Sequence, residues 1–196
     1  MTTTLARLRP TGRQDQLRRQ LVELVLAEGF AHLTVDDYAA RLRCSKRTLY
    51  TLATSKEQLA TLSVREFFRA ATSQVEAALA RLRTPATRLT GYLDAIAAAL
   101  QPASVEFLTD VTDFGPTREL YQVNTDRAAA RVAELINDGV RAKAFRTVSA
   151  AFVGDLVAST MRRILSGEVS RATGLTDAQC YAELSTLVMT ALRRKR

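Results

Sequence analysis

Residues 34–59 read TVDDYAARLRCSKRTLYTLATSKEQL and contain three side chains of the kind that cap the N-terminus of a helix. Thr34, Ser45 and Ser55 each precede a segment of helical composition, and each hydroxyl can accept a hydrogen bond from a backbone N–H of the first turn. Asp37 follows Thr34 at the spacing of a capping box. The stretch therefore predicts two short helices with a tight link, followed by the start of a long helix.

The rest of the chain is also predicted to be helical. No segment shows the alternation of apolar and polar residues that marks a half-buried strand, and Ala, Leu, Arg and Glu are frequent. Residues 1–11 are polar, include Pro10 and are expected to form a loose arm. The predicted fold class is all-α, with about nine helices over residues 12–28, 35–42, 46–52, 56–82, 86–100, 104–113, 116–139, 147–165 and 177–192.

Positive charge is concentrated near the N-terminus. Residues 1–56 hold ten Lys and Arg against five Asp and Glu, whereas residues 57–192 hold fourteen against fifteen, and the last four residues are all basic. The net charge of +8 therefore arises from the two ends of the chain. Such a surplus favours contact with a polyanion, either a nucleic acid or an anionic surface.

Two short capped helices with a tight link are the pattern of a helix-turn-helix, whose second helix enters the major groove of DNA. Lys46 and Arg47 can donate hydrogen bonds to guanine or phosphate, and Thr48 can both donate and accept. Tyr50 and Lys56 are suited to phosphate contacts. We therefore expect the helix that begins at Lys46 to read bases; the alternative is that Lys46 and Arg47 are merely solvated.

The segments GFAHLTVDDYA (29–39), CSKRTLY (44–50) and SKEQL (55–59) resemble the N-terminal signature of the tetracycline-repressor (TetR) family of transcriptional regulators. The resemblance covers about residues 14–62. It implies a DNA-binding helix-turn-helix domain over residues 1–56 and a ligand-binding and dimerisation domain over residues 57–196. It also implies DNA contacts or a supporting cap at Thr34, Ser45, Lys46, Arg47, Thr48, Tyr50, Thr51 and Lys56.

Three residues depart from the pattern of that family. Arg43 stands where the family has a glycine in the turn, and a left-handed backbone there would cost about 1–2 kcal/mol. Ala53 replaces an aromatic residue, which predicts looser packing of the second short helix on the long one. Tyr38 replaces an aliphatic core residue. These departures concern the detailed geometry of DNA contact rather than the fold.

The last two helices are predicted to form a dimer interface. The segment 147–165 is apolar on two sides, so it needs cover on two sides, and the segment 177–192 carries one broad apolar stripe. The alternative is that both stripes belong to the core of a single chain. The predicted interface residues are Phe152, Leu156, Ile164, Leu184, Leu187, Val188 and Ala191.

The family precedent also implies a cavity for a small-molecule effector, although each large side chain that could line it is more often plain core than ligand wall. Glu106, Asp110 and Asp113 share one helix face and would suit a cationic ligand, whereas Asn124, Arg127 and Arg131 would suit an anion. The sequence leaves these two possibilities open. The predicted pocket residues are Phe67, Phe68, Tyr92, Phe107, Phe114, Tyr121, Phe152 and Met161.

Catalytic and metal-binding functions find little support. The chain has one histidine and two cysteines, Cys44 and Cys180, too few for a zinc site, and no nucleophile–base pattern is present. We expect Cys44 to act as a small buried hydrophobe, with a redox sensor as the alternative. No metal or cofactor is predicted. No apolar run is long enough to span a membrane, so a cytoplasmic location and no membrane partner are expected.

The sequence therefore predicts a homodimeric, sequence-specific transcriptional regulator rather than an enzyme. As a repressor, it would bind palindromic double-stranded operator DNA and be released by a small molecule of unknown class. The alternative is a non-specific binder of DNA or anionic surfaces without a ligand switch.

Overall fold

The computed structural model describes residues 12–194, and the predicted N-terminal arm and the last two basic residues lie outside this range. The described residues form ten helices and no strand, which confirms the all-α class. The helices are α1 (Gly12–Glu28), α2 (Val35–Arg41), α3 (Lys46–Leu49), α4 (Lys56–Leu79), α5 (Pro85–Leu100), α6 (Val105–Asp113), α7 (Gly115–Arg141), α8 (Ala150–Leu165), α9 (Glu168–Thr173) and α10 (Asp177–Leu192).

The helix that the sequence did not predict is α9. It has six residues, none of them buried, and it lies between Gly167 and Gly174, whose φ angles of 70° and 72° are left-handed. A helix without a buried face leaves no apolar periodicity to detect. The start of α8 also differs from the prediction, because Ser149 caps this helix and Ala150 is its first residue.

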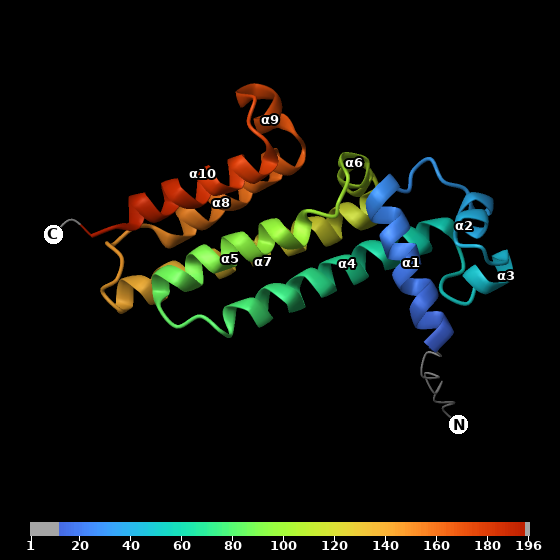
Figure 1. Ribbon diagram of the computed structural model, residues 1–196, viewed down its shortest axis with the longest axis horizontal. Helices are drawn as coiled ribbons and strands as arrows, with labels where there is room; N and C mark the ends of the chain where they lie inside the picture. Colours follow the sequence, from blue (N-terminus) through green and yellow to red (C-terminus); the bar gives the residue numbers. More distant parts are fainter. Residues whose placement is uncertain (1–11, 195–196) are drawn as a thin grey trace.

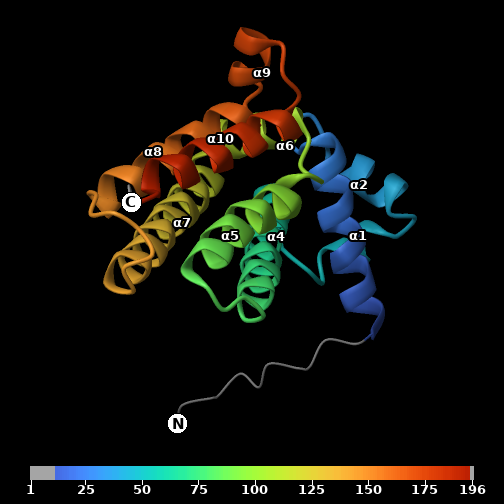
Figure 2. The same ribbon diagram turned by 60° about the vertical axis from the view of Figure 1, so that its left-hand side comes forward.

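The helices form a small group at one end and a larger bundle at the other. Figure 1 shows α1, α2 and α3 gathered around the N-terminal part of α4, α5 and α7 against its C-terminal part, and α8 and α10 on the other side of α5 and α7. In Figure 2, α8 and α10 lie side by side along one side of the bundle, while α9 projects from it. Since α4 belongs to both groups, it connects them mechanically.

Each group has its own hydrophobic core. The N-terminal core combines residues of α1–α4 with residues of α6, and the rings of Phe67 and Phe107 meet edge-on with centroids 5.5 Å apart. This core therefore extends well beyond residue 56. The second core joins the C-terminal half of α4 to α5, α7, α8 and α10. Gly154 lets α8 approach α7 closely, because a Cβ there would lie 2.5 Å from the carbonyl oxygen of Ala129.

Candidate DNA-binding surface and ligand cavity

The first helix of the helix-turn-helix, α2, begins with a complete capping box. Thr34 Oγ1 accepts a hydrogen bond from the backbone N–H of Asp37 at 3.2 Å, and the Asp37 carboxylate accepts one from the backbone N–H of Thr34 at 2.8 Å. The hydrogen bonds from Thr34 hold the pKa of Asp37 below its ordinary value. The start of α2 is therefore fixed by the two residues that the sequence pattern singled out.

The link between α2 and α3 turns through Arg43, which has a φ of 48°. The backbone N–H of Cys44 then bonds to the carbonyl of Ala39 at 3.0 Å, which closes the turn. A left-handed conformation at a residue with a Cβ costs about 1–2 kcal/mol. Arg43 is thus a strained position, and its exposed side chain brings a positive charge next to α3.

The candidate recognition helix, α3, is short and well anchored. Ser45 Oγ accepts a hydrogen bond from the backbone N–H of Thr48 at 3.1 Å, and the two side-chain hydroxyls lie 2.8 Å apart. Leu49 is fully buried in the N-terminal core. Regular helix ends at Leu49, sooner than predicted, and Tyr50 forms the C-cap. Thr51 Oγ1 donates to the carbonyl of Thr48 at 2.7 Å.

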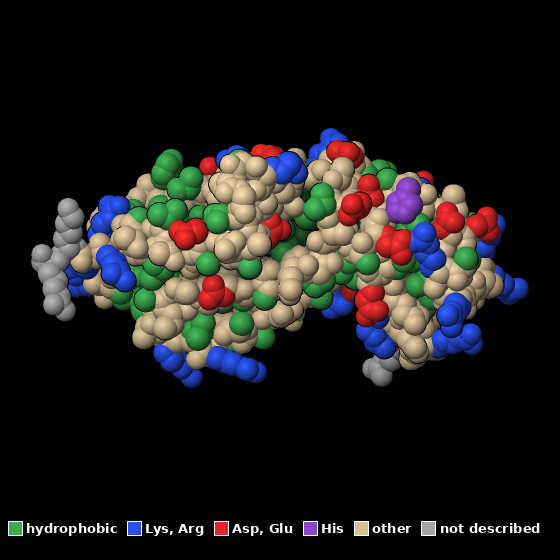
Figure 3. All heavy atoms as spheres, turned by 45° about the horizontal axis from the view of Figure 1, so that its top comes forward, with side chains coloured by type: hydrophobic (Ala, Val, Ile, Leu, Met, Phe, Trp, Pro, Cys, Tyr) green, Lys and Arg blue, Asp and Glu red, His purple; other side chains and the backbone are tan. Residues whose placement is uncertain are grey.

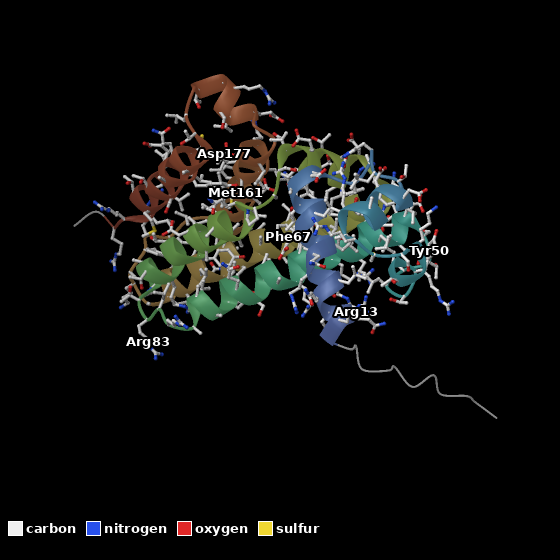
Figure 4. The ribbon with its side chains drawn as sticks, turned by 45° about the vertical axis from the view of Figure 1, so that its right-hand side comes forward. Arg13, Tyr50, Phe67, Arg83, Met161 and Asp177 are labelled. Atoms are coloured by element: carbon white, nitrogen blue, oxygen red, sulfur yellow. The ribbon has the colours of Figure 1, made fainter. Side chains whose placement is uncertain are left out.

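Three side chains of this segment project from the end of the molecule. Lys46 and Arg47 are exposed, and Tyr50 is 45% exposed. Figure 4 shows Tyr50 at the far tip of the helix-turn-helix, and Figure 3 shows Lys and Arg side chains gathered at the same end. A helix N-terminus with exposed basic side chains has the form that enters the major groove.

Lys46 and Arg47 differ in their partners. Lys46 Nζ lies 2.7 Å from the carboxylate of Asp36, and this hydrogen bond raises the pKa of Lys46. Both side chains of the pair are more than half exposed, and exposed pairs of this kind contribute little to stability. Arg47 has no carboxylate partner among residues 12–194. The sequence did not predict the pairing of Lys46 with Asp36, since the only indication was the position of Asp36 in the first turn of α2.

Lys56, at the start of α4, is already engaged within the protein. Its ammonium donates a hydrogen bond to the carbonyl of Ala31 at 2.7 Å, and its side chain is half-buried. Lys56 therefore joins the start of α4 to the loop before α2, while Ser55 caps the same helix through the N–H of Gln58. The residues predicted to contact DNA thus form two groups. Lys46, Arg47 and Tyr50 have exposed side chains, whereas Ser45 and Lys56 hold the helices in place.

The helix-turn-helix contains one unpaired buried hydroxyl. Tyr38 on α2 is fully buried, and its hydroxyl has no hydrogen-bond partner within the described structure. Burial raises the pKa of Tyr38, and the nearby charge of Asp110 adds to the rise.

Ala53, which stands where the TetR family has an aromatic residue, is half-buried and packs against the N-terminal core. Cys44 is also half-buried, and burial raises the pKa of its thiol, which disfavours the reactive thiolate.

A cavity of about 270 Å³ lies in the larger bundle, among α4, α5, α7 and α8. Figure 4 shows one of its wall residues, Met161, inside this bundle. The aromatic and larger aliphatic side chains that line the cavity are Phe68, Val75, Tyr92, Ile96, Leu100, Tyr121, Met161 and Leu165.

The remaining predicted pocket residues lie elsewhere. Phe67 and Phe107 belong to the N-terminal core, and Phe114 packs edge-on against Phe30 with centroids 6.1 Å apart. Phe152 is 67% exposed on the outer side of α8, because the opposite side of that helix faces α7 and the cavity.

Of the two polar sets that the sequence suggested for ligand binding, the one suited to an anion lines the cavity. Asn124, Arg127 and Arg131 line it, together with Glu76 of α4 and Arg162 of α8. The acidic set does not line the cavity. One of its members, Asp110, instead accepts a hydrogen bond from the backbone N–H of Ala31 at 2.8 Å.

The outer face of α8 and α10 is unusually apolar. Phe152, Leu156 and Leu187 are between 48% and 67% exposed, and they border an apolar groove between the two helices. Figure 3 shows hydrophobic side chains on this face. Of the other predicted interface residues, Ala191 is exposed, whereas Ile164, Leu184 and Val188 are buried within the chain.

Two kinds of feature are absent from residues 12–194. No described helix is long and apolar enough to cross a membrane. No group of three or more His, Cys, Asp or Glu side chains in this range is placed to hold a metal ion.

The chain was compared with known families, curated proteins and solved structures. No family model and no curated protein matches its sequence. Among solved structures, it is similar to a transcriptional regulator from Saccharomonospora viridis in complex with choline, with a TM-score of 0.75, 16% identity and coverage of 93% of this chain and 98% of that one. It is also similar to the TetR-family regulator PfmR from Thermus thermophilus, with a TM-score of 0.70, 22% identity and coverage of 92% and 100%.

A third similar structure is that of AibR in complex with isovaleryl coenzyme A and operator DNA. Its TM-score is 0.65 and its identity 17%, with coverage of 89% of this chain and 97% of that one. These likenesses extend over both helical groups and over nearly the whole length of each relative. The chain therefore has the fold of the TetR-family transcriptional regulators.

Proposed function

We propose that this chain is a TetR-family transcriptional regulator that binds specific operator DNA as a homodimer and is released by a small molecule. The observation that carries the proposal is the capped helix α3, which presents Lys46, Arg47 and Tyr50 at the tip of the molecule. The complex of AibR with operator DNA, on the same fold, supports this assignment.

In the proposed complex, α3 lies in the major groove. Arg47, which has no carboxylate partner in the described range, donates to guanine or to a phosphate. Lys46 exchanges the carboxylate of Asp36 for a DNA acceptor, an exchange that costs little because the ion pair is exposed. Tyr50 contacts a phosphate, and Thr34 does so by exchanging the hydrogen bond that its hydroxyl donates to the Asp37 carboxylate, while Ser45 and Lys56 keep the helices in register.

The dimer forms through the outer face of α8 and α10. Large apolar side chains such as Phe152 and Leu187 are rarely left more than half exposed together, and a second copy of the same face would cover them symmetrically. Two recognition helices related by this symmetry would read a palindrome, with half-sites about 34–36 Å or a multiple of it apart.

The ligand switch acts through α4. This helix lines the cavity with Phe68 and Val75 and begins at Lys56, which is bonded to the helix-turn-helix loop. A ligand that prefers one position of α4 shifts the population toward it, by no more than its difference in affinity for the two states. Release from the operator follows when the preferred position moves the two recognition helices out of register.

Selection of binding sites from a pool of random DNA duplexes tests the proposal. We expect a palindromic consensus to which the wild type binds far more tightly than to random duplexes of equal length. Lys46→Ala and Arg47→Ala should each weaken this binding about tenfold or more, since a good base contact contributes about 1–3 kcal/mol. Arg141→Ala, an exposed arginine at the far end of α7, is the matched control and should bind as the wild type does.

Two outcomes would contradict the proposal. Equal affinity for all duplexes would identify a non-specific polyanion binder. Unchanged selectivity in both the Lys46 and the Arg47 variants would show that α3 does not read the bases.

A further inference from the structure

The cavity in the larger bundle has an apolar wall and a positively charged wall. Side chains such as Phe68, Ile96 and Met161 form the apolar part. The charged part consists of three arginines and a single carboxylate, that of Glu76. Most ligand cavities combine an apolar lining with a few placed polar groups, and those groups determine which ligand is bound.

The carboxylate is already neutralised. Arg131 donates to both oxygens of Glu76 at 3.1 Å, and it donates to Glu134 at 2.8 Å. Because Glu76 is the one carboxylate in the lining, no free negative charge is left to receive a cation. Hydrogen bonds to the two glutamates also raise the pKa of Arg131, so this group stays charged.

The other two arginines are not neutralised. Neither Arg127 of α7 nor Arg162 of α8 has a carboxylate partner in the described part of the chain. Arg162 and Tyr121 line the same cavity, where burial raises the pKa of Tyr121 and the positive charge of Arg162 opposes that rise. Both side chains are exposed, so the cavity carries two positive charges without a carboxylate partner at its solvent-facing side, on helices that pack against each other.

The surroundings of Arg162 indicate where a charged group would sit. A second, more polar hollow of about 410 Å³ shares Tyr121, Arg162 and Leu165 with the cavity. Hydroxyl-bearing residues, among them Thr109 and Ser159, line this second hollow, together with Arg163 and Glu168, which are paired with each other at 3.1 Å. A ligand can thus keep its charged end at Arg162, toward the polar hollow, and its apolar body in the main cavity.

From this arrangement we propose that the effector of this protein is an amphiphilic organic anion, with its anionic group bound by Arg127 and Arg162 and its apolar body against Phe68, Ile96 and Met161. The inference rests on the proposed function, because it names the ligand class of the same regulatory cavity. A quaternary ammonium or another cation is disfavoured, because it would meet two unpaired guanidinium groups and no free carboxylate.

A series of probes with one tail and three head groups tests this proposal. Octanoate, octan-1-ol and octyltrimethylammonium are titrated into the full-length protein by calorimetry, without DNA. We expect octanoate to bind about tenfold or more tightly than either of the others, the factor that hydrogen bonds to a charged group provide. Shorter and longer fatty carboxylates are included, so that a tail of the wrong length does not decide the result.

Arginine variants then locate the head group. Arg127→Gln and Arg162→Gln should each lower the affinity for the carboxylate about tenfold and leave that for octan-1-ol unchanged. Arg141→Gln, on α7 outside the cavity, is the matched control and should not alter either affinity. The head-group comparison on the wild type stands even if a cavity variant does not fold.

Equal binding of the three head groups, a preference for the ammonium, or no binding of any carboxylate in the series would overturn the proposal. None of these results depends on DNA. If the carboxylates fail while the palindrome is still bound selectively, the ligand class is wrong and the regulator assignment stands. If they bind as expected but no selective DNA binding exists, the ligand class stands and the regulator assignment fails.

Discussion

The carboxylate of Asp110 in α6 accepts a hydrogen bond from the backbone N–H of Ala31, in the loop between α1 and α2, at 2.8 Å. The same oxygen accepts from the N–H of Phe30 at 2.5 Å. Gly29 allows this approach, since its φ is 76° and a Cβ there would lie 2.5 Å from the carboxylate. Because α6 packs on α7 of the larger bundle, Asp110 connects that bundle to the helix-turn-helix.

Removal of this carboxylate should loosen the connection. We expect Asp110→Ala to lower the free energy of unfolding by about 1–3 kcal/mol, because two backbone N–H groups lose a charged acceptor. Urea denaturation followed by circular dichroism measures the change. Asp113→Ala, on the same helix but with an exposed side chain that makes no hydrogen bond or ion pair within the described residues, is the control and should have little effect. Equal losses in the two variants would mean that the bonds to Phe30 and Ala31 are not specifically stabilising.

The unpaired hydroxyl of Tyr38 leads to a prediction of opposite sign. A buried polar group without a partner costs about 1–3 kcal/mol, so Tyr38→Phe should raise the free energy of unfolding by about 1 kcal/mol. Tyr50→Phe removes the same atom from an exposed site and should be neutral. A loss of stability in Tyr38→Phe would show that the hydroxyl has a partner in solution.

The sequence predicted the helix starts more successfully than the cavity. Thr34, Ser45 and Ser55 all accept the predicted N-cap hydrogen bonds, because a cap depends on residues three positions apart. The cavity depends instead on packing between distant helices. Phe67 and Phe68 are neighbours in the chain and both pack in or against the N-terminal core, yet only Phe68 also lines the cavity.

The charged residues show the same limit. The sequence predicts Arg131 as a candidate ligand contact, but its pairing with Glu76, 55 positions away, follows from the packing of α7 against α4. Helical periodicity predicts which residues share a face, but it does not predict what that face meets.

Tyr92 should make the stability of the protein decrease at high pH. Burial raises its pKa to about 12, whereas in the unfolded chain the phenol ionises near its ordinary value of about 10. Between these values the folded state binds more protons, so the free energy of unfolding falls as the pH rises, by roughly 1.4 kcal/mol per unit for this group. Urea titrations at pH 9 and pH 11 on the wild type and Tyr92→Phe measure it. The variant should lose less stability over this interval; equal losses would mean that the phenol is not desolvated.

The apolar face of α8 and α10 provides the last prediction. Phe152→Asp and Leu187→Asp each place a charge in the proposed dimer interface, where burial without a partner is strongly unfavourable. We expect both variants to sediment as monomers and to lose affinity for the full palindrome while retaining helical content. Val123→Asp is the matched control, since Val123 is also about half exposed but lies on α7 outside the apolar groove. An interface through α8 and α10 predicts that the dimer is lost in the two interface variants and kept in Val123→Asp. A dimer that persists in both interface variants would therefore place the interface elsewhere, and so would a dimer that is lost in all three variants.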